Sequence, residues 1–243
     1  MHLKQPQFLT IGWNAPRNIK TLITTATIDF NLAMHVNDDP NKVKSNREFL
    51  ESKLPNSPMW LNQTHSIDVI NWDNEKSYQI FDADASITTK AKTVCVVMTA
   101  DCLPILLSNK NGDFVAAIHA GWRGLNNGII QQTIAQISDK HKQDIIAFIG
   151  PAINQECFEI GSEVFDAFIA SNPNNKSFFI PSQNQGKHLA DLRGIAELIL
   201  INSGVKATNI TNNKICTKCN TNWFYSYRDN SNTGRFATLI WIE

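Results

Sequence analysis

The sequence predicts an α+β fold, in the form of a layered sandwich with mixed sheets. Apolar or alternating runs typical of strands recur along the chain, and several other stretches carry helical signals. The strands neither alternate strictly with helices nor make an all-β pattern, which favours separate layers of sheet and helix. No internal repeat or long Pro/Gly/Ser linker divides the 243 residues, so we expect residues 1–243 to form a single domain.

Each predicted element has a local signal. The run 8–14 has strand character, and a helix is expected at 39–54, where Asp39 is a typical N-cap and Pro40 suits the first helical position. Alternating or apolar runs then predict the strands 67–72, 94–99, 102–108, 113–119 and 145–150. Further helices are expected at 125–138, 162–171 and 188–204, the last of which is closed by Gly204.

The composition limits the partners and the compartment. The 22 basic and 22 acidic residues cancel without a run of like charges, so we expect a small-molecule partner and neither nucleic acid nor a membrane. The N-terminal residues MHLKQPQFLTIGWN lack the apolar stretch of a signal peptide, and no segment approaches the roughly 18 apolar residues of a membrane span. The sequence therefore favours a cytoplasmic protein, in which the five cysteines would be reduced.

A predicted hairpin brings a thiol and an imidazole to one end of a sheet. Cys102 begins the strand before the turn NKNG, and His119 ends the strand after it. A turn centred between Lys110 and Asn111 pairs the two residues directly, whereas one centred between Asn111 and Gly112 sets them diagonally on the same face. Such a pair suits a nucleophile with its base, or two metal ligands.

A third residue favours the metal. His65 directly precedes the strand 67–72, where a side chain is presented at the end of a sheet. Two imidazoles and a thiolate are donors that zinc prefers, and three protein ligands leave a fourth position for water or substrate. The spacing alone leaves four competing histidines: His2, His35, His141 and His188.

The CxxC pair of Cys216 and Cys219 gives a weaker signal. Neither a second CxxC nor a nearby His pair supplies further metal ligands, and the strand–CxxC–helix setting of a redox motif is absent. We therefore expect both cysteines to have packing roles.

Three arginines are candidates for binding substrate or phosphate: Arg47, Arg123 and Arg228. Arg123 lies between two glycines at the start of a predicted helix, where free N–H groups and the helix dipole favour an anion. Ordinary surface solvation is the alternative for all three.

Several motifs together resemble one known family, the laccase-domain or polyphenol oxidase-like proteins. They are NQTH with His65, DADASITTK with Asp84 and Thr88, TADCLPILL with Asp101 and Cys102, HAGWRGL from His119, GPAI, and FYSYRDNSNTGRFATLIW. The resemblance extends over nearly the whole chain. It implies a single-domain α/β/β/α sandwich, with zinc bound by His65, Cys102 and His119.

The resemblance also implies a function. Members are regarded as purine nucleoside phosphorylases, which convert adenosine, inosine or methylthioadenosine and phosphate to the base and ribose 1-phosphate, and which also deaminate adenosine. The expected catalytic residues are the three ligands and Asp101, which would move protons, and the arginines would bind substrate and phosphate.

Other functions remain open from the sequence. Cys102 and His119 could serve a cysteine hydrolase or amidase that acts on cell-wall precursors. The metal-binding residues could instead serve a non-catalytic zinc or nucleoside sensor. A weak polyphenol oxidase activity would use copper in the zinc site, although the chain has six histidines and no His-x-His pair for several copper ions.

Overall fold

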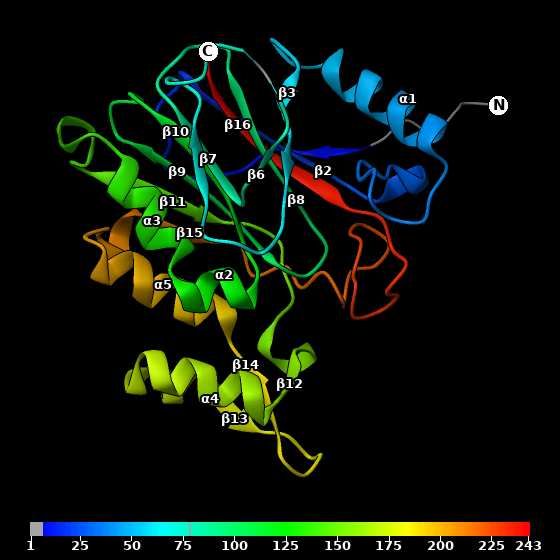
Figure 1. Ribbon diagram of the computed structural model, residues 1–243, viewed down its shortest axis with the longest axis vertical. Helices are drawn as coiled ribbons and strands as arrows, with labels where there is room; N and C mark the ends of the chain where they lie inside the picture. The colour runs from blue at the N-terminus through cyan, green and yellow to red at the C-terminus, as the bar shows by residue number, and fades with distance from the viewer. Residues whose placement is uncertain (1–6, 78) are drawn as a thin grey trace.

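Two large sheets packed face to face form the centre of the molecule (Figure 1). The computed structural model describes residues 7–77 and 79–243. His2, one of the histidines considered above, lies outside these residues.

The first sheet has five strands, in the order β1 (Phe8–Leu9), β2 (Ile19–Thr24), β16 (Phe236–Ile242), β8 (Val94–Thr99) and β3 (Pro58–Met59). The C-terminal strand β16 is antiparallel to both β2 and β8, so a strand from the first part of the chain pairs with the last strand in this sheet (Figure 1). The sequence predicted β8 but assigned no strand to β2 or β16. The expected strand 8–14 is correct only for Phe8–Leu9.

The second sheet has six strands, in the order β15 (Ile210–Asn212), β11 (Ile145–Ile149), β9 (Leu103–Asn109), β10 (Val115–Ala120), β7 (Ala85–Thr88) and β5 (Val69–Asn71). In the β9–β10 hairpin His119 lies opposite Pro104. Cys102, which precedes β9, is therefore diagonal to His119, which is the second of the two predicted registers. Gly112 lies in the connection with a φ of 73°, in the left-handed region that glycine tolerates.

Alternate side chains of each strand point to opposite faces of its sheet. The faces of the two sheets contribute to three hydrophobic cores. In β9, Leu106 faces the core between the two sheets, whereas Ile105 and Leu107 face the outer core of the six-stranded sheet. Helices α3 (Ile129–Gln136) and α5 (Leu192–Asn202) cover that outer core. On the other side, α1 (Pro40–Glu51) covers the five-stranded sheet through Leu50. The layers thus have the expected order α/β/β/α.

The helix ends agree in part with the sequence. Asp39 caps α1 by accepting a hydrogen bond from the Asn41 N–H at 2.9 Å, and Gly204 ends the last helix region with a φ of 94°. The expected helix 125–138 is two helices in the structure. The first, α2 (Trp122–Asn127), begins earlier than expected, and Gly128 in the left-handed conformation separates it from α3. The expected helix 188–204 is shortened, because its first residues belong to a strand.

Smaller elements lie at one end of the sandwich, below α2 and α5 in Figure 1. There α4 (Ser162–Ser171) packs beside a three-stranded sheet of β12 (Glu159–Gly161), β14 (Lys187–Ala190) and β13 (Phe179–Pro181). Elsewhere β4 (Leu61–Asn62) and β6 (Phe81–Asp82) form a parallel pair. Short 3₁₀ helices are η1 (Thr27–Asp29), η2 (Asp139–His141), η3 (Gln155–Cys157), η4 (Pro173–Phe178) and η5 (Ala207–Asn209).

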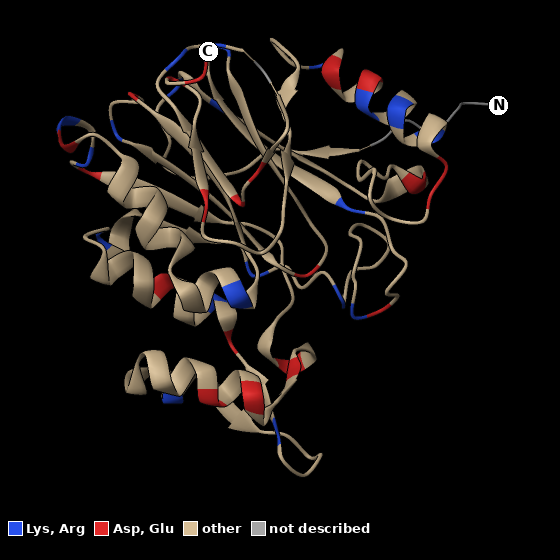
Figure 2. Cartoon of the chain, in the orientation of Figure 1, with Lys and Arg blue, Asp and Glu red and all other residues tan. Residues whose placement is uncertain are grey.

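Charged residues of both signs are interspersed over the elements, most visibly on α1 (Figure 2). Within the described residues, every helix is too short or too polar to cross a membrane.

Candidate metal centre and pocket

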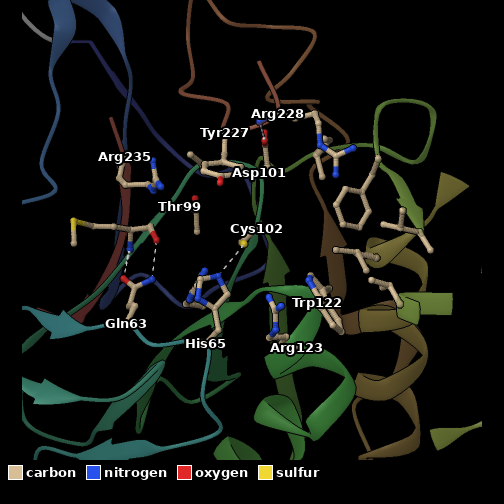
Figure 3. A pocket seen from close by; sticks show the side chains of 18 of the residues that line it. Gln63, His65, Thr99, Asp101, Cys102, Trp122, Arg123, Tyr227, Arg228 and Arg235 are labelled. Carbon is tan, nitrogen blue, oxygen red and sulfur yellow. Dashed lines mark hydrogen bonds between the residues drawn. The ribbon is translucent and has the colours of Figure 1, made fainter. Parts of the chain in front are cut away.

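The loop between β4 and β5 presents His65. Gln63 holds this loop against the end of β8, because its side-chain amide donates to the Met98 carbonyl and accepts from the Met98 N–H, both at 2.8 Å. His65 itself has a φ of 62°, an uncommon conformation for a residue with a side chain. Its imidazole points into a cavity (Figure 3).

Asp84 fixes both histidines of the site. This carboxylate is fully buried, and its Oδ1 lies 2.7 Å from His119 Nδ1, so the ring donates there and leaves Nε2 for the cavity. The same carboxylate accepts from the backbone N–H groups of His65 at 3.0 Å and of Ser66 at 2.6 Å. Asp84 belongs to a motif that carries the family resemblance, but its position before β7 gave no sign of this role.

The three expected residues come together from three separate segments. The ligand atoms of His65, Cys102 and His119 all lie within 4.8 Å of one another, and Cys102 Sγ is 3.9 Å from His65 Nε2. These donors and distances can hold one metal ion. The geometry confirms that the hairpin and the loop meet at one sheet end.

Electrostatics in this group favour charged side chains when no metal is bound. Burial raises the pKa of the Cys102 thiol, but the charge and hydrogen bond of His119 outweigh burial and lower it to about 6. Burial conversely lowers the pKa of His119, while the Cys102 thiolate and Asp84 raise it to about 9. Thiolate and imidazolium thus form an ion pair.

Gly121 leaves the space that the site needs. A Cβ at this position would lie 2.7 Å from His65 Cδ2 and 3.1 Å from Cys102 Sγ. Since real Cβ atoms almost never approach a neighbour so closely, any other residue would displace the His65 ring. The glycine after β10 therefore makes room between two of the donors.

The three donors line a cavity of about 550 Å³, which is within the usual range for small-molecule sites. Apolar side chains form one wall, in particular Trp122, Phe158 and Val164. Three arginines also line the cavity, Arg235 on one side of Tyr227 and Arg228 on the other, with Arg123 next to Trp122 (Figure 3). The cavity thus combines an apolar wall, a cationic rim and the His–Cys–His group.

The carboxylate of Asp101 is held by hydrogen bonds from a distant segment of the chain. Its Oδ1 accepts from Thr217 Oγ1 at 2.6 Å, and its Oδ2 accepts from Ser226 Oγ at 3.1 Å and from the Arg228 N–H at 2.7 Å. Both oxygens are therefore engaged with the segment before β16. The three bonds fix the orientation of the carboxylate, and Oδ1 keeps a second lone pair for the expected proton transfer.

The candidate arginines differ in placement. Arg123 and Arg228 line the cavity, with their guanidinium groups 4.4 Å from the Trp122 ring and 5.1 Å from the Phe158 ring. Arg47 does not belong to the cavity lining: it stacks 4.1 Å over Trp60, and its Nε donates to the Leu32 carbonyl at 2.8 Å. Arg47 thus lies outside the lining, and its expected contact with substrate stays a prediction.

Arg235 also lines the cavity, although it was not among the arginines expected there. This residue precedes β16, within a motif that was quoted only for the resemblance. Arg123 lies at the start of a helix as expected, because α2 begins at Trp122, but this helix has only six residues. The cationic character of the rim therefore comes from side chains.

The remaining histidines lie apart from the three donors. His35 lines the cavity without joining the group, and its pKa is lowered by burial and by Arg235 and Arg47. His141 faces Asp113 at 3.6 Å, and His188 stacks on Phe165 at 4.1 Å. The structure thus selects among the histidines that the spacing left open.

The CxxC pair has a third cysteine as its neighbour in the structure. Cys157 lies beside Cys216 and Cys219, so that three thiols gather where the spacing indicated two. The spacing of the CxxC motif could not indicate Cys157, because this residue is far from the motif in the sequence.

The fold and the site define a class of protein: a two-sheet sandwich with a His–Cys–His group that opens into a small-molecule cavity. Residues 22–243 match the model of the family described as "Multi-copper polyphenol oxidoreductase laccase". The chain belongs to this family, as the motifs indicated.

Relatives carry a different description. The chain is 39% identical over 244 residues to "Purine nucleoside phosphorylase PA4543" of Pseudomonas aeruginosa, covering 97% of this chain and 98% of that one. It is 42% identical over 214 residues to "Purine nucleoside phosphorylase YfiH" of Escherichia coli strain K12, covering 87% and 86%. These names support the expectation of an enzyme.

Solved structures have the same fold. The crystal structure of Neisseria meningitidis protein NMB0706 matches with a TM-score of 0.88 and 42% identity, covering 97% of this chain and 99% of that chain. Bacillus licheniformis hypothetical protein YfiH matches with a TM-score of 0.87 at 24% identity, covering 100% and 98%. The sandwich is thus a shared architecture.

Proposed function

We propose that this chain, as a single domain over residues 1–243, is a zinc-dependent purine nucleoside phosphorylase that also deaminates adenosine. One observation carries the proposal: the His65, Cys102 and His119 donors face a cavity that has both an apolar wall and an arginine rim. The substrates would be adenosine, inosine or methylthioadenosine together with phosphate. The printed names of the relatives support the phosphorylase activity.

The donor set fits zinc. Neutral imidazole and thiolate are its preferred ligands, Asp84 orients His119, and Gly121 leaves the space between the donors open. Copper binds the same donor types and is the alternative ion. A zinc ion held there would act as a Lewis acid, which can polarise a substrate atom or make a water molecule more acidic.

The apolar wall suits the purine base. Trp122 and Phe158 offer aromatic faces, and the exposed carboxylate of Glu163 lies at the cavity edge. We assign Glu163 the role of accepting a hydrogen bond from an N–H of the base.

The rim suits phosphate. Guanidinium groups of Arg123, Arg228 and Arg235 provide forked donors for its oxygens. In phosphorolysis a phosphate oxygen bonds to C1′ of the ribose while the C1′–N9 bond breaks. The electron pair of that bond stays on the base, which leaves as it takes up a proton.

The decisive experiment incubates the pure protein, with its zinc content measured, with inosine and with or without phosphate. We expect phosphate-dependent release of hypoxanthine, and no release by Cys102→Ala. Absence of base release from zinc-loaded protein would contradict the phosphorylase, whereas production of inosine from adenosine tests deamination separately.

A second candidate is a cysteine hydrolase or amidase acting on cell-wall precursors. It is favoured by the Cys102–His119–Asp84 series, in which the pKa of the thiol is held at about 6 by its histidine against the opposing effect of burial. A thiol hydrolase would keep or gain activity when a chelator strips the metal, and the zinc enzyme would lose it.

An oxidase remains the weakest candidate. Among the described residues, histidines enter one cluster of metal-binding groups, which has room for a single ion. Oxidation of a phenol by copper-loaded protein, compared with zinc-loaded protein, would test this activity.

A further inference from the structure

Three thiols from two distant segments converge on the side of the pocket wall. Cys157 ends the short helix η3, and Cys216 and Cys219 lie in the segment that follows β15. Cys157 Sγ is 3.3 Å from Cys219 Sγ, and all three sulfur atoms lie within 4.8 Å of one another. All three are free cysteines.

The backbone around these thiols is pre-organised. Buried Arg193 donates to the Ala152 carbonyl at 3.0 Å and to the Ile215 carbonyl at 2.8 Å, which clamps the two segments together. The Asn220 side chain donates to the Cys216 carbonyl at 2.8 Å. The CxxC turn is thus fixed from both sides.

Backbone N–H groups are also aimed at one sulfur. The Asn154 N–H donates to Cys216 Sγ at 3.4 Å. Although burial raises the pKa of the Cys216 thiol, this bond and one from the Cys219 backbone outweigh it and lower that pKa. Hydrogen bonds of this kind orient and tune metal-bound thiolates.

We propose that Cys157, Cys216 and Cys219 form a second metal site, which binds one zinc ion and leaves a fourth position open to solvent. With Zn–S bonds of about 2.3 Å, tetrahedral geometry separates thiolates by about 3.8 Å. The distance of 3.3 Å between two sulfurs and the limit of 4.8 Å for all three bracket that value. Exposed Cys219 provides the entry path, since Cys216 is buried.

The charges suit such an ion. Three thiolates and a divalent cation carry one net negative charge, and two cations lie nearby. Arg193 and Lys218 lie close enough to interact electrostatically with thiolates at Cys216 and Cys157, respectively. The soft thiolate donors favour zinc over magnesium or calcium, which take oxygen ligands.

The site would stabilise one wall of the pocket. Cys157 precedes Phe158, which lines the pocket, and Thr217 lies inside the CxxC turn and donates to Asp101. A bound ion would cross-link these two segments without sharing a ligand with the His65–Cys102–His119 group. The inference therefore does not depend on the proposed function.

The test measures zinc per chain in protein purified with a non-thiol reductant, and uses variants that separate the two sites. We expect about two zinc ions in the wild type, one in Cys102→Ser, one in Cys219→Ser and none in the double variant. Cys157→Ser should repeat the result of Cys219→Ser. Cys95→Ala is the matched control, because Cys95 belongs to neither group, and it should keep both ions.

Cobalt(II) gives a second readout. Added to Cys102→Ser, it should produce the strong thiolate charge-transfer bands of a three-sulfur site and raise the melting temperature, and both effects should vanish when Cys219→Ser is added. One zinc ion in the wild type with Cys219→Ser and Cys157→Ser unchanged would overturn the proposal. So would an intact mass lower by two hydrogens without a second ion, because it indicates a Cys157–Cys219 disulfide formed by an external two-electron oxidant.

Discussion

Asp84→Asn is the perturbation that most directly tests how the first site is built. The wild-type carboxylate is fully buried and accepts from His119 Nδ1 and His65 N–H at Oδ1, and from Ser66 N–H and Thr64 N–H at Oδ2. An asparagine keeps one acceptor oxygen and turns an NH₂ group toward the other two donors. Whichever way the amide lies, two donors lose their acceptor.

The loss of stability can be calculated from the two lost hydrogen bonds. A hydrogen bond to a charged group is worth about 1.5–3 kcal/mol, so two lost bonds lower the free energy of unfolding of metal-free protein by about 3–6 kcal/mol. If the amide NH₂ faces His119 Nδ1, the ring carries its proton on Nε2 and ceases to be a ligand. Loss of such a supporting carboxylate typically reduces metal affinity by about 10–100-fold.

The assay has three measurements: urea unfolding of metal-free protein, zinc affinity by competition with a chelator, and the dependence of stability on pH. Burial raises the pKa of Asp84, but hydrogen bonds from His119 and Ser66 hold it below its ordinary value. The carboxylate therefore stabilises the fold above its ordinary pKa, and this contribution is lost as pH falls through the lowered value. The stabilities of wild type and variant should converge in acid.

Asp82→Asn is the matched control, because Asp82 is exposed two residues away and should change neither stability nor zinc affinity much. Equal zinc affinity and equal stability in Asp84→Asn and wild type would refute the assignment of Asp84 as the residue that orients His119.

Three further predictions concern the same cavity. Gly121→Ala should displace the His65 ring and lower zinc affinity at least about tenfold, whereas Gly12→Ala, with nothing within 4 Å of its Cβ, should not; equal affinities would contradict the steric argument. In metal-free protein the Cys102 thiolate should be lost as pH falls through about 6, because His119 outweighs burial in setting its pKa; iodoacetamide alkylation that rises only near the ordinary thiol range would count against the ion pair. Arg123→Lys should raise the phosphate KM of inosine cleavage about tenfold while deamination of adenosine and the melting temperature change little; parallel losses in all three would indicate a structural role.

The sequence determined those features that depend on local chemistry. The period of two in β8, β9 and β10 is set by side chains that must face two cores, and Asp39 caps α1 through a neighbouring N–H. Two of the turns considered for the hairpin keep Cys102 and His119 on one face, a three-residue loop would separate their faces, and the observed register is one of the first two. Fold class and layer order were predicted through these patterns and through the family motifs.

Strand β2 and the strand that contains residues 188–190 were not predicted, because their local sequence patterns do not distinguish a strand from other structure. Strand β2 follows a polar segment, and its burial is completed only by pairing with β16 from the far end of the chain. Residues 188–190 continue a helical pattern but pair with β12 and β13, so the sheet partner overrides propensity. Such pairing is invisible to a local window.

The tertiary structure alone decided which distant groups meet. Asp84 acquires its role because a loop and a strand end both turn their donors toward one buried carboxylate, and Arg235 reaches the cavity because β16 lies beside β8. Arg47 stacks on the Trp60 ring outside the cavity lining, and Cys157 lies beside Cys216 and Cys219 although it is distant from them in the sequence. The physical reason is common to all four: residue type and local spacing specify what a side chain can do, but its partners are set by how sheets pair and pack.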